Sequence, residues 1–562
     1  MKTVHSLLRF LLLCLVPFFY VNSFSQGIVD SDIETKIDSL FDNYDTIPGV
    51  SIGVIKDGQL ILEKQYGLAN LEYNIPISDA SVFTLCSVSK QFTVFGLMLL
   101  EEKGLLSLDD NIRKYVPELP DYGHVITLRH LANNTSGLRS NLQLLGLKGY
   151  TADDMINQQT VNDIIFRQKE LNFVPGDKYN YSNSGFVLLA KVIEKVSNKS
   201  FSDYMKETVF APLGMNDSFV MDDYQKVINN KVSSYEISDG KFVFAPSNYS
   251  YVGASGVYLT LKDFSKWAAN FTNIKVGNQK IFNKMNTKGI LNNGEESFYA
   301  LGQIVQEYNG LHRIWHSGAD AGYRAYIGRF PEQNLSFILL SNNANVYAEG
   351  EALKVADLFL KPYFKENKTA AIKTNKKTEY INLSSEQKMK LKGSYVNQDY
   401  EIIRNINLKN DTLVYIRPDQ NNRTTKLWPL APNLFTLGGN KNVEVLFNNK
   451  ILKILVDNKE EEKYSKYTAK TYTEKELKEF LGIYYSDELE TTYTLKIINN
   501  QLTILNSRIG MIDITPLKED VFLGKTWIFN SLVFERDVNG LVNGFRVSGQ
   551  RVKNMYFEKN ME

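Results

Sequence analysis

The stretch from residue 84 to residue 110, TLCSVSKQFTVFGLMLLEEKGLLSLDD, joins a polar head to an apolar pattern of helical period. Phe92, Phe95 and Met98 recur three residues apart, which is the spacing of one face of an α-helix. Ser87 and Lys90 stand three residues apart at the start of this pattern, so on a helix both side chains project from the same face. The stretch therefore predicts an apolar helix with a hydroxyl and an amine at its N-terminal end.

These two side chains form a candidate nucleophile and base. A serine is a weak nucleophile unless a base takes its proton, and a lysine one turn away can be that base if burial or a nearby cation lowers its pKa. The helix N-terminus adds a partial positive charge beside the serine. The S-x-x-K pattern also occurs at Ser238 and at Ser385, without an apolar helix behind it. A plain helix start followed by a solvated lysine is therefore the alternative interpretation of Ser87.

Length and composition bound the class of protein. A chain of 562 residues predicts more than one domain, and its formal net charge of +1 gives no basic excess for nucleic acid binding. Lys2 and Arg9 precede an apolar run over residues 10–21, and Ser23 and Ser25 are small residues of the kind found at a signal-peptidase site. We therefore expect residues 1–25 to be an export signal, with an uncleaved anchor as the alternative. We expect a periplasmic or secreted protein without a membrane span in the rest of the chain.

A second polar cluster, Tyr181-Ser182-Asn183, stands before an apolar run of helical period over residues 186–193. The tyrosine and the asparagine are therefore expected in a loop at a helix start, where rigid elements often position catalytic groups. N-capping of the helix by Ser182 or Asn183 is the structural alternative.

A third cluster, His316-Ser317-Gly318, lies between two strand-like runs. A glycine at this place lets a ligand pass close to the strand backbone. The five histidines and the cysteine that follows the export signal, Cys86, do not stand at metal-ligand spacing. We expect no metal site.

The C-terminal part of the chain has a different pattern. Residues 366–379 are rich in lysine and lack an apolar period, which predicts a linker. Two similar segments of short alternating strands follow, which we call the first β unit (residues 380–470) and the second β unit (residues 471–562). Gly393 matches Gly482 at an offset of 89 residues, and capping boxes begin at Ser384 and Thr473. Each unit is predicted to be a small antiparallel barrel or sandwich.

With the three clusters in this order, residues 28–362 resemble the penicillin-recognising serine hydrolases. The tyrosine of the second cluster is similar to that of the branch that contains class C β-lactamases, D-aminopeptidases and esterases. The resemblance implies an α/β domain over residues 26–365 of the β-lactamase/transpeptidase type, with an antiparallel sheet flanked by helices. C-terminal all-β units follow it in this chain.

The resemblance also implies a role for each residue. Ser87 attacks a carbonyl and forms an acyl-enzyme, while Lys90 and Tyr181 share the general-base role. Asn183 holds the lysine and the substrate amide. The backbone N–H groups of Ser87 and Ala319 form the oxyanion hole.

His316 departs from the lysine that many β-lactamases and transpeptidases carry at this place, and it is similar to the histidine of aminopeptidase-like members. Histidine is only partly charged near neutral pH. Arg324, six residues past Gly318, is expected to face the cleft and bind a carboxylate instead, with a surface loop position as the alternative. Lys90 and a partly charged His316 are expected to lower the pKa of Tyr181.

The function implied is a serine hydrolase that cleaves a small amide or ester, such as a peptide with a D-residue, without a cofactor. Its partner is a small molecule or a short peptide. One alternative is a β-lactamase or a penicillin-binding D,D-peptidase. Another is a binding or scaffold protein that keeps the fold without turnover. The trailing β units are similar to the barrels appended to D-aminopeptidases, which shape access to the active site. The oligomeric state does not follow from the sequence.

Overall fold

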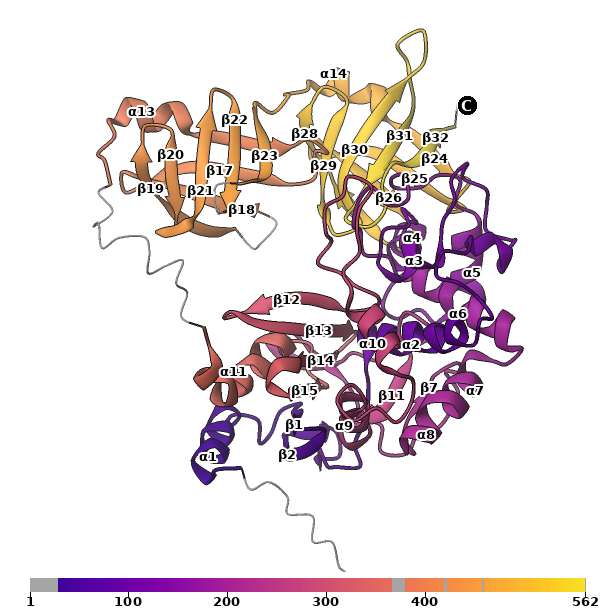
Figure 1. Ribbon diagram of the computed structural model, residues 1–562. Helices are drawn as coiled ribbons and strands as arrows, with labels where there is room; N and C mark the ends of the chain where they lie inside the picture. The colour runs from indigo at the N-terminus through magenta and orange to yellow at the C-terminus, as the bar shows by residue number, and fades with distance from the viewer. Residues whose placement is uncertain (1–28, 366–379, 419–421, 457–458, 561–562) are drawn as a thin grey trace, which may run out of the picture.

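The computed structural model describes residues 29–560 apart from 366–379, 419–421 and 457–458 (Figure 1). The predicted export signal, residues 1–25, and the predicted linker, residues 366–379, lie outside the described residues. Within the part of the chain that is described, no helix is long and apolar enough to cross a membrane.

The domain predicted over residues 26–365, which we call the hydrolase-like domain, is built around a six-stranded antiparallel sheet. The strand order is β12-β13-β14-β15-β1-β2. Strand β1, the first of the chain, pairs with β15, the last strand of this domain in chain order, with Val50 opposite Ser341. The sheet therefore joins the two ends of the domain. The strands are β1 (Val50–Lys56), β2 (Gln59–Tyr66), β12 (Ile304–Tyr308), β13 (Leu311–Asp320), β14 (Tyr323–Phe330) and β15 (Leu335–Ser341).

Helices cover both faces of this sheet. On one face α1 (Ser31–Leu40) and α11 (Ala348–Leu360) pack through Ile37 and Val355 in one apolar cluster with strand residues. On the other face lie α9 (Leu261–Asn270) and, beyond it, α2 (Ser89–Glu102) and α6 (Asn183–Ser197). The predicted fold of an antiparallel sheet flanked by helices is confirmed.

Helix α2 is buried on all sides because its apolar residues point in every direction. The ring of Phe92 stacks on Trp267 with 4.3 Å between centroids, and Phe95 stacks on Phe282 at 5.5 Å. Helix α6 packs against it within the same apolar cluster. The N-terminal end of α2 is therefore held rigidly.

Shorter elements complete the domain. Strand β5 (Val82–Thr84) leads into α2. It forms a three-stranded sheet with β11 (Val257–Thr260) and β7 (Phe219–Val220), in the order β5-β11-β7. The remaining helices are α3 (Leu128–Ala132), α4 (Asn141–Lys148), α5 (Gln158–Phe166), α7 (Phe201–Met205), α8 (Ala211–Leu213) and α10 (Gln279–Asn286). The remaining strands are β3 (Leu68–Asn70), β4 (Ile75–Pro76), β6 (Ile156–Asn157), β8 (Tyr235–Ser238), β9 (Lys241–Phe244) and β10 (Tyr249–Ser250).

The first β unit contains a closed antiparallel barrel, preceded by α13 (Ser385–Leu391) with the predicted capping box at Ser384. Its strands are β16 (Gly393–Asn397), β17 (Ile403–Lys409), β18 (Thr412–Arg417), β19 (Arg423–Ala431), β20 (Leu434–Leu437), β21 (Asn440–Asn448), β22 (Ile451–Val456) and β23 (Lys459–Tyr467).

The second β unit repeats this order after α14 (Glu474–Leu477), which carries the capping box at Thr473. Its strands are β24 (Gly482–Ser486), β25 (Thr491–Ile498), β26 (Gln501–Asn506), β27 (Gly510–Asp513), β28 (Thr515–Lys518), β29 (Val521–Thr526), β30 (Phe529–Arg536), β31 (Val542–Ser548) and β32 (Met555–Lys559). The sheet is open between β27 and β28, which together stand where β19 stands in the first β unit. In both units a buried tyrosine, Tyr395 or Tyr484, donates to the carbonyl four residues earlier. The predicted all-β units are confirmed.

The two β units differ in how they contact the hydrolase-like domain. The first has an apolar core of its own around Phe435 and Phe447. The second shares one continuous apolar cluster with the hydrolase-like domain, and Figure 1 shows it beside α4. The hydroxyl of Tyr493 donates to the carbonyl of Leu147 there. Among the described residues, the second β unit therefore packs directly against the hydrolase-like domain.

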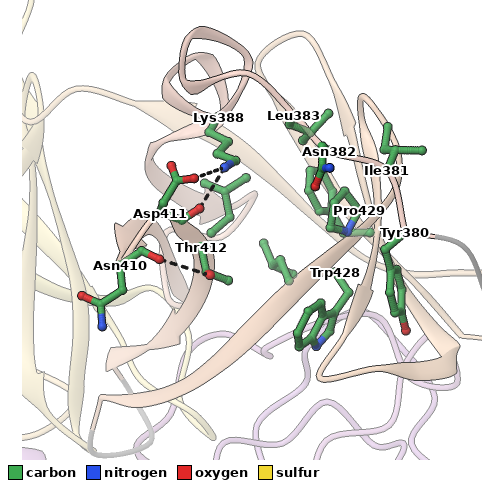
Figure 2. A pocket seen from close by; sticks show the side chains of 13 residues that line it. Tyr380, Ile381, Asn382, Leu383, Lys388, Asn410, Asp411, Thr412, Trp428 and Pro429 are labelled. Atoms are coloured by element: carbon green, nitrogen blue, oxygen red, sulfur yellow. Dashed lines mark hydrogen bonds and ion pairs between the residues drawn. The ribbon is translucent and has the colours of Figure 1, made fainter.

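A cavity of about 270 Å³ lies in the first β unit (Figure 2). Lys388 closes one side by donating from Nζ to Asp411 Oδ2 at 2.7 Å, and Trp428 lies on the other side. None of the predicted catalytic residues lines this cavity, so it is separate from the site described next.

Candidate active site

Ser87 lies in a single 3-10 turn, Cys86–Val88, between β5 and α2. The preceding residue, Cys86, has a φ of 48°, a left-handed conformation that is strained for a residue with a side chain. The backbone N–H of Leu85 donates to the carbonyl of Val257 at 2.8 Å and fixes the turn to β11. Across residues 81–90 every residue but Ser87 is buried. The turn thus directs one hydroxyl out of the core.

Lys90 contacts Ser87 as the spacing predicts. Its Nζ lies 3.2 Å from Ser87 Oγ and donates to the carbonyl of Ala254 at 2.7 Å. Burial, and secondly the positive charge of Arg551, hold the pKa of Lys90 well below its ordinary value. Lys90 makes no ion pair with a carboxylate in the described chain. A buried amine in this state is suited to accept the serine's proton.

Tyr181 lies beside this pair, with its ring centroid 4.8 Å from Lys90 Nζ. Burial raises the pKa of Tyr181 to about 12, and a hydrogen bond with Ser87 and the charge of Arg551 only partly offset it. The expected lowering of the pKa of Tyr181 is therefore wrong, because loss of solvent outweighs the nearby positive charge. With a pKa of about 12 the phenol is protonated near neutral pH and therefore has a proton to donate.

Asn183 is the first residue of α6, and it is buried. Ser182 precedes the helix but makes no side-chain capping bond, so the capping alternative does not account for this cluster. The Oδ1 atom of Asn183 has no hydrogen-bond partner within the described residues. A buried acceptor without a partner is costly unless a ligand satisfies it, which agrees with the predicted contact to a substrate amide. The predicted bond between Asn183 and Lys90 is wrong, because Lys90 Nζ donates to Ser87 Oγ and the carbonyl of Ala254 and leaves Asn183 Oδ1 without a donor.

His316 is buried on β13, and its tautomer follows from its two contacts. Nδ1 lies 2.6 Å from the carbonyl of Ser317, which only accepts, so Nδ1 carries the proton. Nε2 then accepts from the hydroxyl of Tyr299 at 2.9 Å. Burial, with the charge of Lys90 as a smaller cause, lowers the pKa of His316 to about 3. The expectation of a partly charged His316 is therefore wrong, because the ring is shielded from water.

Gly318 packs against the turn that carries the nucleophile. A methyl group at this position would lie 2.4 Å from the carbonyl oxygen of Leu85 and 3.1 Å from the backbone nitrogen of Ser87. The close approach predicted at this glycine is thus made by the chain's own backbone, not by a ligand. The contact places the strand that contains Ala319 beside the Ser87 N–H. The oxyanion role of Ala319 and a substrate contact by Ser317 stay predictions.

Gly318→Ala should misplace the Ser87 turn. The new methyl group would meet backbone atoms of Leu85 and Ser87, which cannot move aside as a flexible side chain can. We expect kcat to fall about 100-fold, the effect of a shift of about 1 Å in a reacting group. Gly53→Ala on β1 is the matched control, since its new methyl would meet only side-chain atoms of Leu261 and Leu60, at 3.2 Å or more. Steady-state kinetics on both variants checks this, and equal losses would contradict it.

Arg324 lies at the start of β14. Its guanidinium donates to the carbonyls of Ala321 at 2.9 Å and Tyr323 at 2.7 Å, in its own turn. Its predicted role in binding a substrate carboxylate stays a prediction, and these two bonds compete with it.

Three residues at the site were not indicated by the sequence motifs. Tyr299 orients His316, as described above. Asp320 is half-buried two residues past Gly318. Desolvation raises its pKa to about 6, and Ser247 donates to its Oδ2 at 2.9 Å. Arg551 of the second β unit lies with Cζ 4.7 Å from the centroid of the Tyr181 ring. Position on the same strand could have indicated Asp320, whereas no local pattern indicates Arg551. No group of His, Cys, Asp and Glu side chains suited to a metal ion occurs among the described residues.

The pH dependence of the reaction should follow Lys90. A protonated amine cannot accept the serine's proton, so kcat/KM should fall as the pH is lowered through the pKa of Lys90. His316→Gln should leave the position of this fall unchanged, because a group with a pKa of about 3 is already neutral. Asp320→Asn serves as the control for the carboxyl group with a pKa of about 6. A pH profile whose fall disappears in His316→Gln would contradict this assignment.

The antiparallel sheet, the helices on both faces and the Ser87 turn between them define a fold of the β-lactamase/transpeptidase type. The Beta-lactamase family model matches residues 37–359, more than half of the chain. The chain therefore belongs to the Beta-lactamase family of serine hydrolases.

Two relatives show what this chain is similar to. Penicillin-binding protein 4* of Bacillus subtilis (strain 168) is 30% identical over 335 residues, which cover 54% of this chain and 71% of the relative. A D-aminopeptidase of Cereibacter sphaeroides (strain ATCC 17029 / ATH 2.4.9) is 28% identical over 313 residues, which cover 55% of this chain and 60% of the relative. The match thus spans about three fifths of that D-aminopeptidase.

Solved structures show the same fold. The octameric penicillin-binding protein homologue from Pyrococcus abyssi has a TM-score of 0.55 at 23% identity, covering 78% of this chain and 99% of its own. The D-amino acid amidase from Ochrobactrum anthropi SV3 has a TM-score of 0.50 at 22% identity, covering 59% of this chain and 99% of its own. At these identities the likeness concerns the fold alone.

Proposed function

We propose that this chain is an exported serine hydrolase that cleaves a small amide or ester, such as a peptide with a D-residue, through an acyl-enzyme on Ser87. One observation carries the proposal. Ser87 Oγ lies 3.2 Å from Nζ of the buried Lys90, whose pKa is held well below its ordinary value. An amine whose pKa is lowered, at hydrogen-bond distance from a serine hydroxyl, is suited to act as its base.

The two halves of the reaction use the same groups. Lys90 takes the proton of Ser87 as Oγ attacks the carbonyl carbon, and backbone N–H groups stabilise the oxyanion. Tyr181, protonated because its pKa is about 12, donates its proton to the leaving group and recovers one from the Lys90 ammonium. In deacylation, water attacks the ester carbonyl and Lys90 takes the proton of the water through the phenol. The C–Oγ bond then breaks, and the Lys90 ammonium returns a proton to Oγ, so that Ser87 leaves as the alcohol.

The name D-aminopeptidase of a relative that is 28% identical supports a D-residue in the substrate. A panel of chromogenic substrates tests this: D-alanine p-nitroanilide, its L-isomer, an aryl acetate and a chromogenic cephalosporin. We expect turnover of the D-amide or the ester, and its loss in Ser87→Ala. Turnover of the cephalosporin alone would favour a β-lactamase, and no turnover of any substrate would favour a binding protein.

Export rests on the N-terminal sequence pattern alone. The intact mass of the protein recovered outside the cytoplasm should correspond to a chain that begins at Gln26. A mass that retains Met1 would contradict export by cleavage.

A further inference from the structure

The loop of residues 549–554, between β31 and β32, carries the second β unit into the hydrolase-like domain. At Arg551 both backbone groups are fixed by that domain. Its N–H donates to Gln143 Oε1 at 2.6 Å, and its carbonyl accepts from the N–H of Ser140 at 3.2 Å and from Asn172 Nδ2 at 3.0 Å. The next residue, Val552, is fully buried. The position of Arg551 is therefore set by main-chain contacts and does not depend on a flexible side chain.

A buried arginine holds the same loop from within the catalytic domain. Arg139 donates from Nε to the carbonyl of Lys553 at 3.1 Å and from one terminal nitrogen to the carbonyl of Asn554 at 3.2 Å. Its other terminal nitrogen contacts Glu488 of the second β unit at 2.8 Å. Such a network costs desolvation unless every partner is in place, so the loop is built into the domain contact.

The side chain of Arg551 extends from this fixed backbone to the catalytic tyrosine. Its Cζ lies 4.7 Å from the centroid of the Tyr181 ring, whose distance to Lys90 Nζ is 4.8 Å. The guanidinium forms no hydrogen bond or ion pair with any residue that the structure describes. Arg551 is half-buried. A half-buried cation that has an aromatic face but no anion as partner can still accept a carboxylate.

The other candidate cations at the site are not free for this purpose. Arg324 is bonded to carbonyls of its own turn. His316 is neutral and bonded on both ring nitrogens. The amine of Lys90 is held by Ser87 and the carbonyl of Ala254. Among the described residues, Arg551 is thus the cation beside Tyr181 whose guanidinium N–H groups have no acceptor.

We propose that Arg551 binds a carboxylate of the substrate, so that the second β unit supplies a specificity residue and the preferred substrates are amides or esters that carry a free carboxylate near the scissile bond. This inference rests on the proposed function, and it names the substrate class of that same site. The planar guanidinium offers two parallel N–H donors to a carboxylate. Removing it should therefore weaken turnover of anionic substrates selectively.

Two matched ester pairs test the charge preference in the full chain. p-Nitrophenyl hexanoate and mono-p-nitrophenyl adipate differ by a methyl against a carboxylate on the acyl side. The acetate esters of methyl 3-hydroxybenzoate and of 3-hydroxybenzoate place a methyl ester against a carboxylate on the leaving group, which is the same difference in charge. In at least one pair, Arg551→Gln should lower kcat/KM for the anionic ester about 10- to 100-fold, the effect of losing a hydrogen bond to a charged group. The neutral ester should change little, and Arg551→Lys should restore part of the preference.

Lys553→Gln is the control, because it removes a cation from the same loop that is already paired with Glu401 of the first β unit. It should leave the preference between the paired esters unchanged. Equal losses for neutral and anionic esters in Arg551→Gln would overturn the inference and leave Arg551 with an electrostatic effect on Lys90 alone. Labelling of Ser87 by a fluorophosphonate tests the proposed function separately. If the wild-type chain is labelled and no ester pair responds to the variants, the inference fails by itself; if it is not labelled, the proposed function fails first.

Discussion

Ser87→Ala, Lys90→Ala and Tyr181→Phe are each expected to lower kcat by a factor on the order of 10³ or more, and the triple variant by little more than the worst single one. The reason is geometric. Nζ of Lys90 lies 3.2 Å from Oγ of Ser87, and in the proposed mechanism the phenol beside it is the donor for the leaving group. When residues act in one proton path, the loss of any one of them blocks the whole path. The reductions in kcat from the single substitutions therefore do not add in the triple variant. Single-turnover and steady-state kinetics on the four proteins measure this.

Ser89→Ala is the control for this set. Ser89 is fully buried, and its Oγ accepts from the backbone N–H of Val257 at 3.1 Å instead of pointing to the site. Its loss should lower the free energy of unfolding by about 1 kcal/mol and leave acylation intact. Additive losses among the three catalytic variants would mean that the groups act independently, contrary to the shared proton path.

Glu488→Gln is expected to lower the free energy of unfolding by about 3 kcal/mol or more, because it leaves a buried guanidinium without its closest counter-charge. The Arg139 side chain has no exposed surface, and the Glu488 carboxylate is 8% exposed. Burial already lowers the pKa of Arg139, and Glu488 is the first group that counters this effect. Urea denaturation of the full chain measures the loss.

Lys169→Ala is the matched control on the same contact. Its ion pair with Asp487 is 63% and 72% exposed, so its removal should cost less than about 1 kcal/mol. The double variant Arg139→Met with Glu488→Gln should recover part of the stability, because it removes both charges at once. A Glu488→Gln variant as stable as Lys169→Ala would contradict a structural role for this pair. Arg139 also holds the loop of Arg551. We therefore expect Glu488→Gln to lower the turnover of anionic substrates in addition to the stability of the chain.

Local chemistry in the sequence was enough to predict that Ser87 and Lys90 meet. The i, i+3 spacing of Ser87 and Lys90 determines their proximity on a helix, and the 3.2 Å contact in the structure agrees with it. The pattern of short strands likewise predicted the all-β units. In both cases the relevant neighbours are close in the chain or repeat along it.

The electrostatic expectations failed for a reason that lies outside any motif. Lys90 and a partly charged His316 were expected to lower the pKa of Tyr181. Burial instead raises the pKa of Tyr181 and lowers that of His316, so both rings shift toward their neutral forms. The degree of enclosure depends on packing among distant segments, including Tyr299 and Gly318. Arg551 was missed for a related reason, because it lies in the second β unit and reaches Tyr181 only through docking of that unit.

The most direct test of the account is to locate the covalent adduct. The purified chain would be treated with an acylating probe, quenched, digested and mapped by tandem mass spectrometry. The account predicts a single adduct on Ser87, absent from Ser87→Ala and present at normal yield in Ser89→Ala. An adduct on another residue, or hydrolysis that persists in Ser87→Ala, would contradict it.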